Sequence, residues 1–394
     1  MIANKKKKLF IEANSLLDKN PSGISKLLFS MILSMSTNAD FDKDFKIILF
    51  IPLNKKNLLK RWKLPSTVST RTLPLPLRII NGLNKRHLMF PVDLWLGSGV
   101  YLFPNYRTLP LIRSKCMTYI HDVAYAKHPE TLLEINRKFL EHTIPQSVKT
   151  SDMILTLSEQ SKIELLDLFP QFSSKIKVVP AGVDESHYVI SDSNEGYKKL
   201  LNDVGVEDNK YILFVGNIEP RKNIAYLIDV YVELIDRGTV KDNVALLLVG
   251  GGGWNNEELI LRIKTLVASG YKIVRPSSRI SDEDLPTLYK HSILTTLLSI
   301  HEGFGMTPLE ALASGSKVVV SDIPVLHEVC GKSVLYAPLK DKEQAADVFE
   351  TALNQPRNTS YSREILDEYS WDNAAETFRK NLINVENTKV EGVL

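Results

Sequence analysis

Two glutamates bracket a glycine-bearing loop in the second half of the chain. Glu302 precedes Gly303-Phe304-Gly305, and Glu310 lies eight positions after Glu302. The apolar run 293–298 before the loop predicts a buried strand, and Pro308 suits the first turn of a helix after it. Free N–H groups at a helix start bind anions, while a carboxylate accepts hydrogen bonds from a vicinal diol. The pattern favours a ligand with a diphosphate between two hydroxyl-bearing groups, as in a nucleotide-sugar, over a surface loop with two solvated acids.

The stretch from Glu302 to Gly315 resembles the E-x7-E motif and following helix of GT-B glycosyltransferases, specifically the large retaining family 4. The resemblance implies that Glu302 contacts the donor sugar and that Glu310 binds the ribose. It also implies that the loop amides contact the diphosphate, which are those of Gly303, Phe304 and Gly305.

A second candidate loop carries two cations at the start of a predicted helix. The strand 211–215 ends in Gly216, and Arg221 and Lys222 precede a helical pattern from Ile224. Cations at this end oppose the helix dipole unless an anion binds there. The segment resembles the family's G-x-x-x-x-R-K-N loop, which implies that Gly216, Arg221 and Lys222 contact the donor diphosphate.

Two further segments concern the nucleotide. Residues 281–285 resemble the family's V-S-D-E-E-L region, which implies that Arg279 and Ile280, just before it, contact the base. The glycine run 250–253 after a strand suggests a dinucleotide site instead. The G-x-G-x-x-G pattern fails, however, because position 255 is Asn. We therefore disfavour an NAD site.

The first half of the chain offers two candidate residues. The strand 116–120 runs into His121, and polar residues at the carboxyl end of an α/β strand lie where ligands bind. With His128-Pro129-Glu130, this segment resembles the family's "HD…HPE" region, which implies that His121 faces the sugar and the reaction centre. Gly23 resembles part of the family's "GIG" donor loop, although an ordinary turn explains it equally well.

The triplet Asp40-Phe41-Asp42 has the D-x-D form that binds a metal in other transferases. No apolar strand leads into it, so we expect a solvated turn in a charged connector. Enzymes with the GT-B fold, which this sequence resembles, generally need no metal. We therefore expect neither a metal nor an organic cofactor.

The segment 45–92 contains no Asp or Glu but carries many Lys and Arg residues, with Leu58, Leu59, Trp62 and Leu64 among them. Basic residues mixed with Trp and Leu favour the surface of an anionic membrane. A solvated basic surface is the alternative. Nucleic acid is disfavoured, because no aromatic-rich recognition motif accompanies the charge.

Composition is that of a soluble globular protein with two or three domains: 394 residues, 44% hydrophobic, 24% charged and a net charge of +3. Two distant cysteines, no signal peptide and no run of about 18 apolar residues favour a cytoplasmic chain that is peripheral on the inner membrane. Alternating strands and helices predict parallel sheets. We expect a GT-B fold of two Rossmann-like domains facing a cleft. An acceptor-binding domain would span 1–185, completed by a helix at 371–394, and a nucleotide-sugar domain would span 186–370.

The resemblance implies a retaining transfer of a hexose from a nucleoside diphosphate sugar to an acceptor hydroxyl. The acceptor expected from the basic first domain is a saccharide, preferably a lipid-linked one, in capsule or O-antigen synthesis. A nucleotide-sugar epimerase or a phosphorylase of the same fold is the alternative, and a non-enzymatic binding module is the third possibility. The set of Glu302, Glu310, Arg221, Lys222 and His121 disfavours the last.

Overall fold

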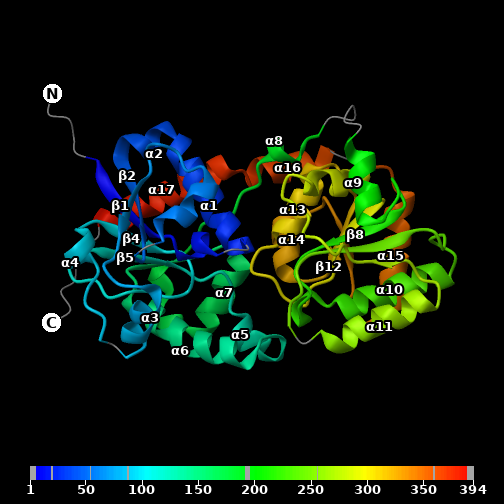
Figure 1. The fold of residues 1–394 in the computed structure, drawn as a ribbon, viewed down its shortest axis with the longest axis horizontal. Coiled ribbons are helices and arrows are strands. Elements are labelled where there is room, and N and C mark those ends of the chain that lie inside the picture. The colour runs from blue at the N-terminus through cyan, green and yellow to red at the C-terminus, as the bar shows by residue number, and fades with distance from the viewer. Residues whose placement is uncertain are drawn as a thin grey trace. The chain divides into compact units, whose positions relative to one another are not determined.

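The computed structural model describes residues 6–18, 21–53, 55–86, 88–190, 196–254, 256–357 and 360–387. The chain divides into two compact α/β units, each built on a parallel sheet (Figure 1). The first unit comprises 1–123, 138–182 and 371–394, and the second comprises 124–137 and 183–370. The expectation of two parallel-sheet α/β domains is therefore confirmed.

The first unit contains a seven-stranded sheet in the order β3-β2-β1-β4-β5-β6-β7. Its central strands are buried on both faces, which explains their unbroken apolar sequences. The strand order reverses between β1 and β4, so these two strands form the switch point of the sheet. The strands are β1 (Lys7–Glu12), β2 (Phe45–Ile51), β3 (Ser69–Thr72), β4 (Val100–Phe103), β5 (Lys115–Tyr119), β6 (Met153–Thr156) and β7 (Ile176–Val178).

The helices of this unit are α1 (Gly23–Thr37), α2 (Ala39–Asp44), α3 (Leu77–Lys85), α4 (Asp93–Leu96), most of α6 (Glu134–Thr150), α7 (Glu159–Leu168) and α17 (Trp371–Asn387), with the 3-10 turns η1 (Asn14–Leu17), η2 (Lys56–Trp62) and η4 (Pro170–Lys175). The C-terminal helix α17 packs against α1 and α2 (Figure 1). The expected solvated turn at Asp40-Phe41-Asp42 is wrong. These residues belong to α2, capped by Asn38, and Phe41 is buried.

The second unit contains a six-stranded sheet in the order β10-β9-β8-β11-β12-β13, with its switch point between β8 and β11. The strands predicted around the glycine loops are present with nearly the expected bounds. The strands are β8 (Tyr211–Val215), β9 (Ala245–Val249), β10 (Ile273–Val274), β11 (Leu294–Leu297), β12 (Val318–Ser321) and β13 (Leu335–Ala337).

The helical elements of this unit are α5 (Ala124–Lys127), η3 (Pro129–Thr131), α8 (Glu185–Tyr188), α9 (Gly196–Val204), η5 (Pro220–Lys222), α10 (Ile224–Asp236), α11 (Glu257–Ala268), α12 (Leu285–His291), α13 (Met306–Ala313), α14 (Pro324–Cys330), α15 (Lys342–Asn354) and α16 (Ser360–Glu368). Residues 185–209 are polar and show no clear periodicity in the sequence, yet α8 and α9 lie there. Leu201 and Val204 anchor α9 in the core, an apolar spacing too short to stand out among polar neighbours.

The basic segment 45–92 is not one continuous surface. Its first residues form the buried strand β2, and Leu59 is 5% exposed. The Trp62 ring packs on Phe29, and its Nε1–H donates to the Leu16 carbonyl oxygen at 2.8 Å. Trp62 therefore has a role in packing. Among the helices that the structure describes, none is both long and apolar enough to cross a membrane.

Candidate active site

The predicted donor loops follow the two strands at the switch point of the second sheet. Gly216 comes directly after β8, and Glu302 follows β11. In open parallel sheets, the carboxyl ends of the two switch-point strands diverge and leave a crevice where ligands bind. The topology therefore brings together two loops that are about 80 residues apart in the sequence.

An ion cluster joins these two loops. Glu302 Oε2 accepts from Arg221 Nη1 at 2.8 Å, and Glu302 Oε1 accepts from Lys222 Nζ at 2.6 Å. Arg221 Nη1 also donates to the His301 carbonyl oxygen at 2.8 Å, and Nη2 donates to Glu219 Oε1 at 2.8 Å. Three of the predicted site residues are thus in direct contact, and the two loops are locked to each other.

The electrostatics of Glu302 follow from this cluster. Its side chain is 7% exposed. Burial by itself would raise the pKa of this carboxyl, but the charges of Arg221 and Lys222 outweigh burial and hold the pKa well below its usual range. Glu302 is therefore ionised near neutral pH, and it holds the two cations in place.

Glu219 is a functional candidate that the sequence analysis missed. Its side chain is only 8% exposed, and its carboxylate pairs with Arg221. The sequence feature that could have revealed it is an acidic residue two positions before Arg221, inside the same loop. With Glu219 and Glu302 opposite Arg221 and Lys222, the formal charges balance, so each cation is oriented by a carboxylate before any ligand arrives.

The loop 303–305 leads into α13, whose start offers free backbone donors. Gly305 caps this helix with φ of +99°, and a Cβ at this position would lie 2.7 Å from Leu326 Cδ2. The first turn of α13 contains no acidic residue, and no side chain caps it. Its N–H groups and its dipole can therefore face an anion, as the sequence predicted.

The glycine run 250–253 packs against the Gly216 loop. A Cβ on Gly250 would lie 1.8 Å from the Gly216 carbonyl oxygen, and a Cβ on Gly253 would lie 2.0 Å from that of Ile218. Gly252 forms a β-bridge with Ile218. Close approach of two backbones thus explains these glycines without a dinucleotide, and Gly216 in turn lies against the Lys222 side chain.

Glu310 lies on α13 and is held by a tyrosine from α12. The hydroxyl of Tyr289, which is 0% exposed, donates to Glu310 Oε2 at 2.8 Å. Burial, followed by the charge of Glu310, keeps the pKa of Tyr289 well above its usual value, so the phenol remains a donor. Tyr188 of α8 flanks the pair, with ring centroids 6.3 Å from Tyr289. Sequence reasoning missed both tyrosines, because no local motif links them to Glu310.

A segment from the first half of the chain belongs to the second unit and lies beside the ion cluster. The His128 ring is 5.2 Å from the ring of His301, the residue before Glu302. Thr131 is anchored through its carbonyl oxygen, which accepts from Trp254 Nε1 at 3.0 Å. The sequence suggested an active-site role for the His121 to Glu130 region, and the structure places its His128 end next to the Glu302 loop.

His121 and Gly23 lie in the first unit. His121 follows β5, is 5% exposed, and its Nε2 contacts the Pro104 carbonyl oxygen at 2.8 Å. Burial lowers the pKa of His121, only partly opposed by that hydrogen bond and by Asp122, so the ring is neutral at pH 7. Gly23 is the first residue of α1, capped by Ser22.

The two residues predicted to contact the base, Arg279 and Ile280, lie between β10 and α12, and Arg279 is exposed.

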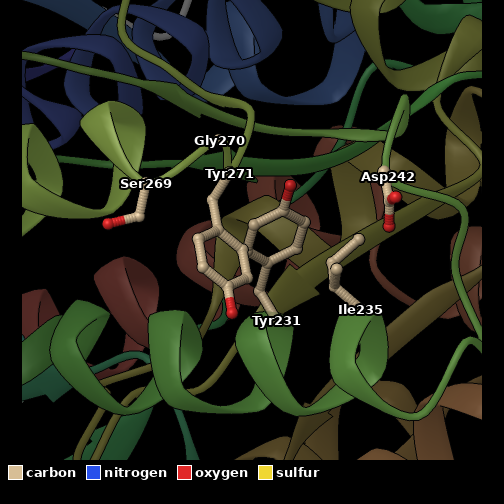
Figure 2. A pocket seen from close by; sticks show the side chains of 6 residues that line it. All are labelled: Tyr231, Ile235, Asp242, Ser269, Gly270 and Tyr271. Carbon is tan, nitrogen blue, oxygen red and sulfur yellow. The ribbon is translucent and has the colours of Figure 1, made fainter.

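A surface pocket of about 290 Å³ lies near β9 and β10 (Figure 2). Asp242 and the segment 269–271 precede these strands, so the pocket is at the amino ends of the sheet, opposite the candidate loops. Its lining comprises Tyr231, Ile235, Asp242, Ser269, Gly270 and Tyr271.

Comparison with known proteins defines the class. Residues 198–372 match the family described as "Glycosyl transferases group 1", a range that includes both candidate loops. The structure resembles that of HepE from Anabaena, solved in complex with UDP and glucose, with a TM-score of 0.68 and 15% identity over 96% of this chain and 100% of that one. The chain has the GT-B fold and is a glycosyltransferase of the hexosyltransferase class.

Relatives of this chain include enzymes of O-antigen synthesis. O-antigen chain mannosyltransferase B of Escherichia coli is 28% identical over 278 residues, which is 70% of this chain and 71% of that protein. O-antigen chain mannosyltransferase RfbU of Salmonella typhimurium is 27% identical over 291 residues, which is 73% of this chain and 74% of that protein.

Proposed function

We propose that this chain is a retaining family 4 enzyme that transfers mannose from a nucleoside diphosphate sugar to a saccharide hydroxyl, in the assembly of a surface polysaccharide. The single observation that carries the proposal is the ion cluster of Glu302, Arg221 and Lys222 beside the start of α13. A site with two oriented cations and a helix N-terminus suits a leaving diphosphate. The mannosyltransferase relatives support the choice of sugar.

In the proposed step, the bond from the anomeric carbon to the phosphate oxygen breaks, and a bond to the acceptor hydroxyl oxygen forms on the same face. The acceptor proton passes to the leaving phosphate. Negative charge grows on the diphosphate, where Lys222, Arg221 and the α13 N–H groups stabilise it. Glu302 orients the cations and the sugar, and Glu310 binds the ribose. In the first unit, His121 is the residue that the family resemblance assigns to the reaction. No metal or organic cofactor takes part.

We also propose that the acceptor is lipid-linked and that the first unit rests on the inner face of the cytoplasmic membrane. The described residues between Phe45 and His121 expose no carboxylate, because the only acid in that stretch is Asp93. Asp93 is 3% exposed, and its carboxylate accepts from the backbone N–H groups of Ile112 and Arg113. The stretch therefore presents basic side chains and no exposed carboxylate of its own, while Arg107 and Lys115 pair with Glu12 and Asp152 from outside it. A surface of this kind suits anionic lipid headgroups.

A group of exposed apolar side chains coincides with these charges. We call the surface formed by α3, residues 88–96 and residues 107–113 the apolar platform. Hydrogen bonds from Asn84 to the Thr108 carbonyl and from Val92 to the Pro110 carbonyl connect its parts. Its exposed apolar side chains are Ile79 (48% exposed), Leu88 (66%), Phe90 (40%), Leu94 (53%), Trp95 (59%) and Ile112 (62%). Aliphatic and aromatic side chains among arginines are typical of a protein surface that enters the headgroup layer. The platform shares α3 and residues 88–92 with the basic segment 45–92 and adds residues 93–96 and 107–113, and we propose it as the membrane contact.

The function is tested with purified protein and a panel of UDP-, GDP-, ADP- and dTDP-sugars, with NAD as the control. A ligand at about a hundred times its Kd stabilises the folded state by about 2.7 kcal/mol. We expect GDP-mannose to raise the melting temperature and NAD to leave it unchanged. Radiolabelled mannose should then appear in lipid extracted from a membrane acceptor fraction, with its anomeric configuration retained. If no nucleotide-sugar binds, the proposal fails.

An epimerase is distinguished from a transferase by incubating the donor without an acceptor, because an epimerase converts the donor sugar without one. A phosphorylase is distinguished from a transferase by adding inorganic phosphate in place of the nucleotide. The match to glycosyltransferases across residues 198–372 and the O-antigen relatives favour transfer over both.

A further inference from the structure

The surface pocket of Figure 2 lies at the amino ends of the second sheet, on the edge opposite the donor loops. Its volume is about 290 Å³. Small-molecule sites typically have volumes of about 300–1,000 Å³, so this pocket has room for a small ligand or a single long side chain. The last turns of α10 and the residues after α11 form most of its lining. The proposed transfer uses none of these residues.

Two tyrosine rings form the apolar part of this pocket, together with Ile235. Tyr231 of α10 is only 1% exposed, and Tyr271, after α11, is half-buried. Their ring centroids are 6.5 Å apart, and their planes are inclined by 65°. Figure 2 shows both rings, with Ile235 and Asp242 to one side of them. The face of an aromatic ring attracts a cation, more strongly where water is excluded. Because Tyr271 is the more accessible of the two, its ring is the surface that a ligand meets.

The side-chain hydroxyls of the lining already donate to protein acceptors. The Tyr231 hydroxyl donates to two backbone carbonyl oxygens, at 2.9 and 3.1 Å. The Tyr271 hydroxyl donates to Asp236 Oδ1 at 2.8 Å, and the Ser269 hydroxyl donates to a carbonyl oxygen one turn earlier in the chain at 3.1 Å. Burial raises the pKa of Tyr231 to about 12, so its phenol keeps this proton at neutral pH. A ligand must therefore bring its own hydrogen-bond donors.

The electrostatic environment of the pocket is negative. Asp242 is exposed, and its carboxylate has no ion-pair partner among the residues that the structure describes. The helices α10 and α11 both end at the pocket, and neither has a basic residue in its last turn to offset the negative end of its dipole. Arg237 follows α10, but its guanidinium pairs with two other carboxylates. Lys241 and Lys272 are exposed and do not line the pocket.

We propose that this pocket binds an organic cation, which is an ammonium or guanidinium group on an apolar stem. The charged group lies between the Tyr271 ring and the Asp242 carboxylate, and the stem lies along Ile235. Ammonium and guanidinium groups carry donors and no acceptors, which matches a lining whose own donors are engaged. A free polyamine and a basic side chain of a partner protein both present this chemistry. The site is separate from the donor loops, and the inference does not depend on the proposed transfer.

The test compares cations with neutral molecules of the same shape. The full chain is titrated with n-butylammonium, spermidine and N-acetyl-arginine amide, and binding is followed by saturation-transfer NMR. The neutral counterparts are 1-butanol and N-acetyl-citrulline amide. We expect the cations to bind about tenfold or more tightly than their counterparts, because only they gain from the ring and the carboxylate. Tighter binding of spermidine would identify a free polyamine as the source, and tighter binding of the arginine amide would identify a partner's side chain.

Variants assign the binding to this pocket. Asp242→Asn and Tyr271→Leu should each weaken cation binding about three- to tenfold, because one removes the charge and the other removes the ring face. Tyr271→Phe keeps the ring and should bind as the wild type does. The matched control is Asp203→Asn, at an exposed position on α9, which should leave cation binding unchanged. Asp242 is exposed, so its variant should fold even if Tyr271→Leu does not.

The inference is overturned if the cations bind no better than their neutral counterparts, or if Asp242→Asn binds them as the wild type does. GDP is titrated by thermal shift in the same samples. Asp242→Asn should keep the wild-type response to GDP, because the pocket and the donor loops lie at opposite edges of the sheet. A loss of that response in Asp242→Asn would contradict a separate site.

Discussion

The two switch points of this molecule are built from similar chemistry but differ in how their residues lie along the chain. At β8 and β11, two contiguous loops contribute Glu219, Arg221, Lys222 and Glu302, and the cations and carboxylates contact one another directly. At β1 and β4, single residues from 12–14, 81 and 107 meet one by one. The first arrangement forms a motif in the sequence, and the second does not.

The contiguous arrangement at β8 and β11 suits the diphosphate that we propose there. A diphosphate is small and highly charged, so backbone N–H groups and cations on short loops suffice to hold it. The following predictions test this contrast, starting with the largest expected effect.

Lys222→Ala should lower kcat for transfer by about 10²- to 10³-fold, because it removes one preorganised charge from the leaving diphosphate. Glu302 keeps its partner Arg221 in this variant, so the fold should survive. The measurement is steady-state kinetics with circular dichroism as the control for folding. Lys210→Ala is the matched control, because Lys210 forms an exposed ion pair with Glu207 and should not affect transfer. Full activity of Lys222→Ala would remove the donor-site assignment.

Gly250→Ala should destabilise the protein by about 1–3 kcal/mol and weaken nucleotide binding, because the added methyl overlaps the Gly216 carbonyl oxygen. Gly252→Ala is the control in the same run, since no other atom lies within 4 Å of the place that a Cβ would take there. Urea denaturation and GDP thermal shift measure the two effects. Equal behaviour of the two variants would contradict the packing explanation of the glycine run.

Replacing Leu88 and Trp95 together by Ser should weaken binding to vesicles that contain phosphatidylglycerol by about tenfold or more, because burying one large apolar side chain contributes about 1.5–3 kcal/mol. Leu261→Ser is the matched control, as Leu261 is 67% exposed in the second unit. Vesicle co-sedimentation at two salt concentrations measures the effect. If the double variant binds as well as the wild type, the apolar platform is not the membrane contact.

His121 should make stability depend on pH. Burial lowers its folded pKa below the ordinary value of 6.5, so its contribution is complete above that pH and is lost as pH falls below it. The unfolded chain takes up the proton there, at a cost of up to about 1.4 kcal/mol per pH unit. Urea denaturation between pH 7.5 and 5.5 should show a shallower slope for His121→Asn than for the wild type. His142→Asn, at an exposed position on α6, should keep the wild-type slope.

Much of the second unit was predictable because its signals are local. The apolar run before Gly216 and the acid-glycine-acid pattern at Glu302 fix a strand, a loop and a helix within about 20 residues each, and the structure has those elements. The helices at 185–209 were missed because their few buried residues are scattered among polar ones. Trp62 was grouped with the apolar residues of a membrane-favouring segment, because nothing near it in the sequence indicates the Phe29 ring on which it packs.

The sequence by itself determined the parallel-sheet α/β architecture and the composition of the donor loops, because strand periodicity, glycine positions and charge order are properties of neighbouring residues. Only the tertiary structure decided that Glu302 holds Arg221 and Lys222, that Tyr289 holds Glu310, and that Glu12 meets Arg107. These pairs depend on which strands are adjacent in each sheet. Strand order is set by burial of the whole sheet between its helices, which no short stretch of sequence encodes.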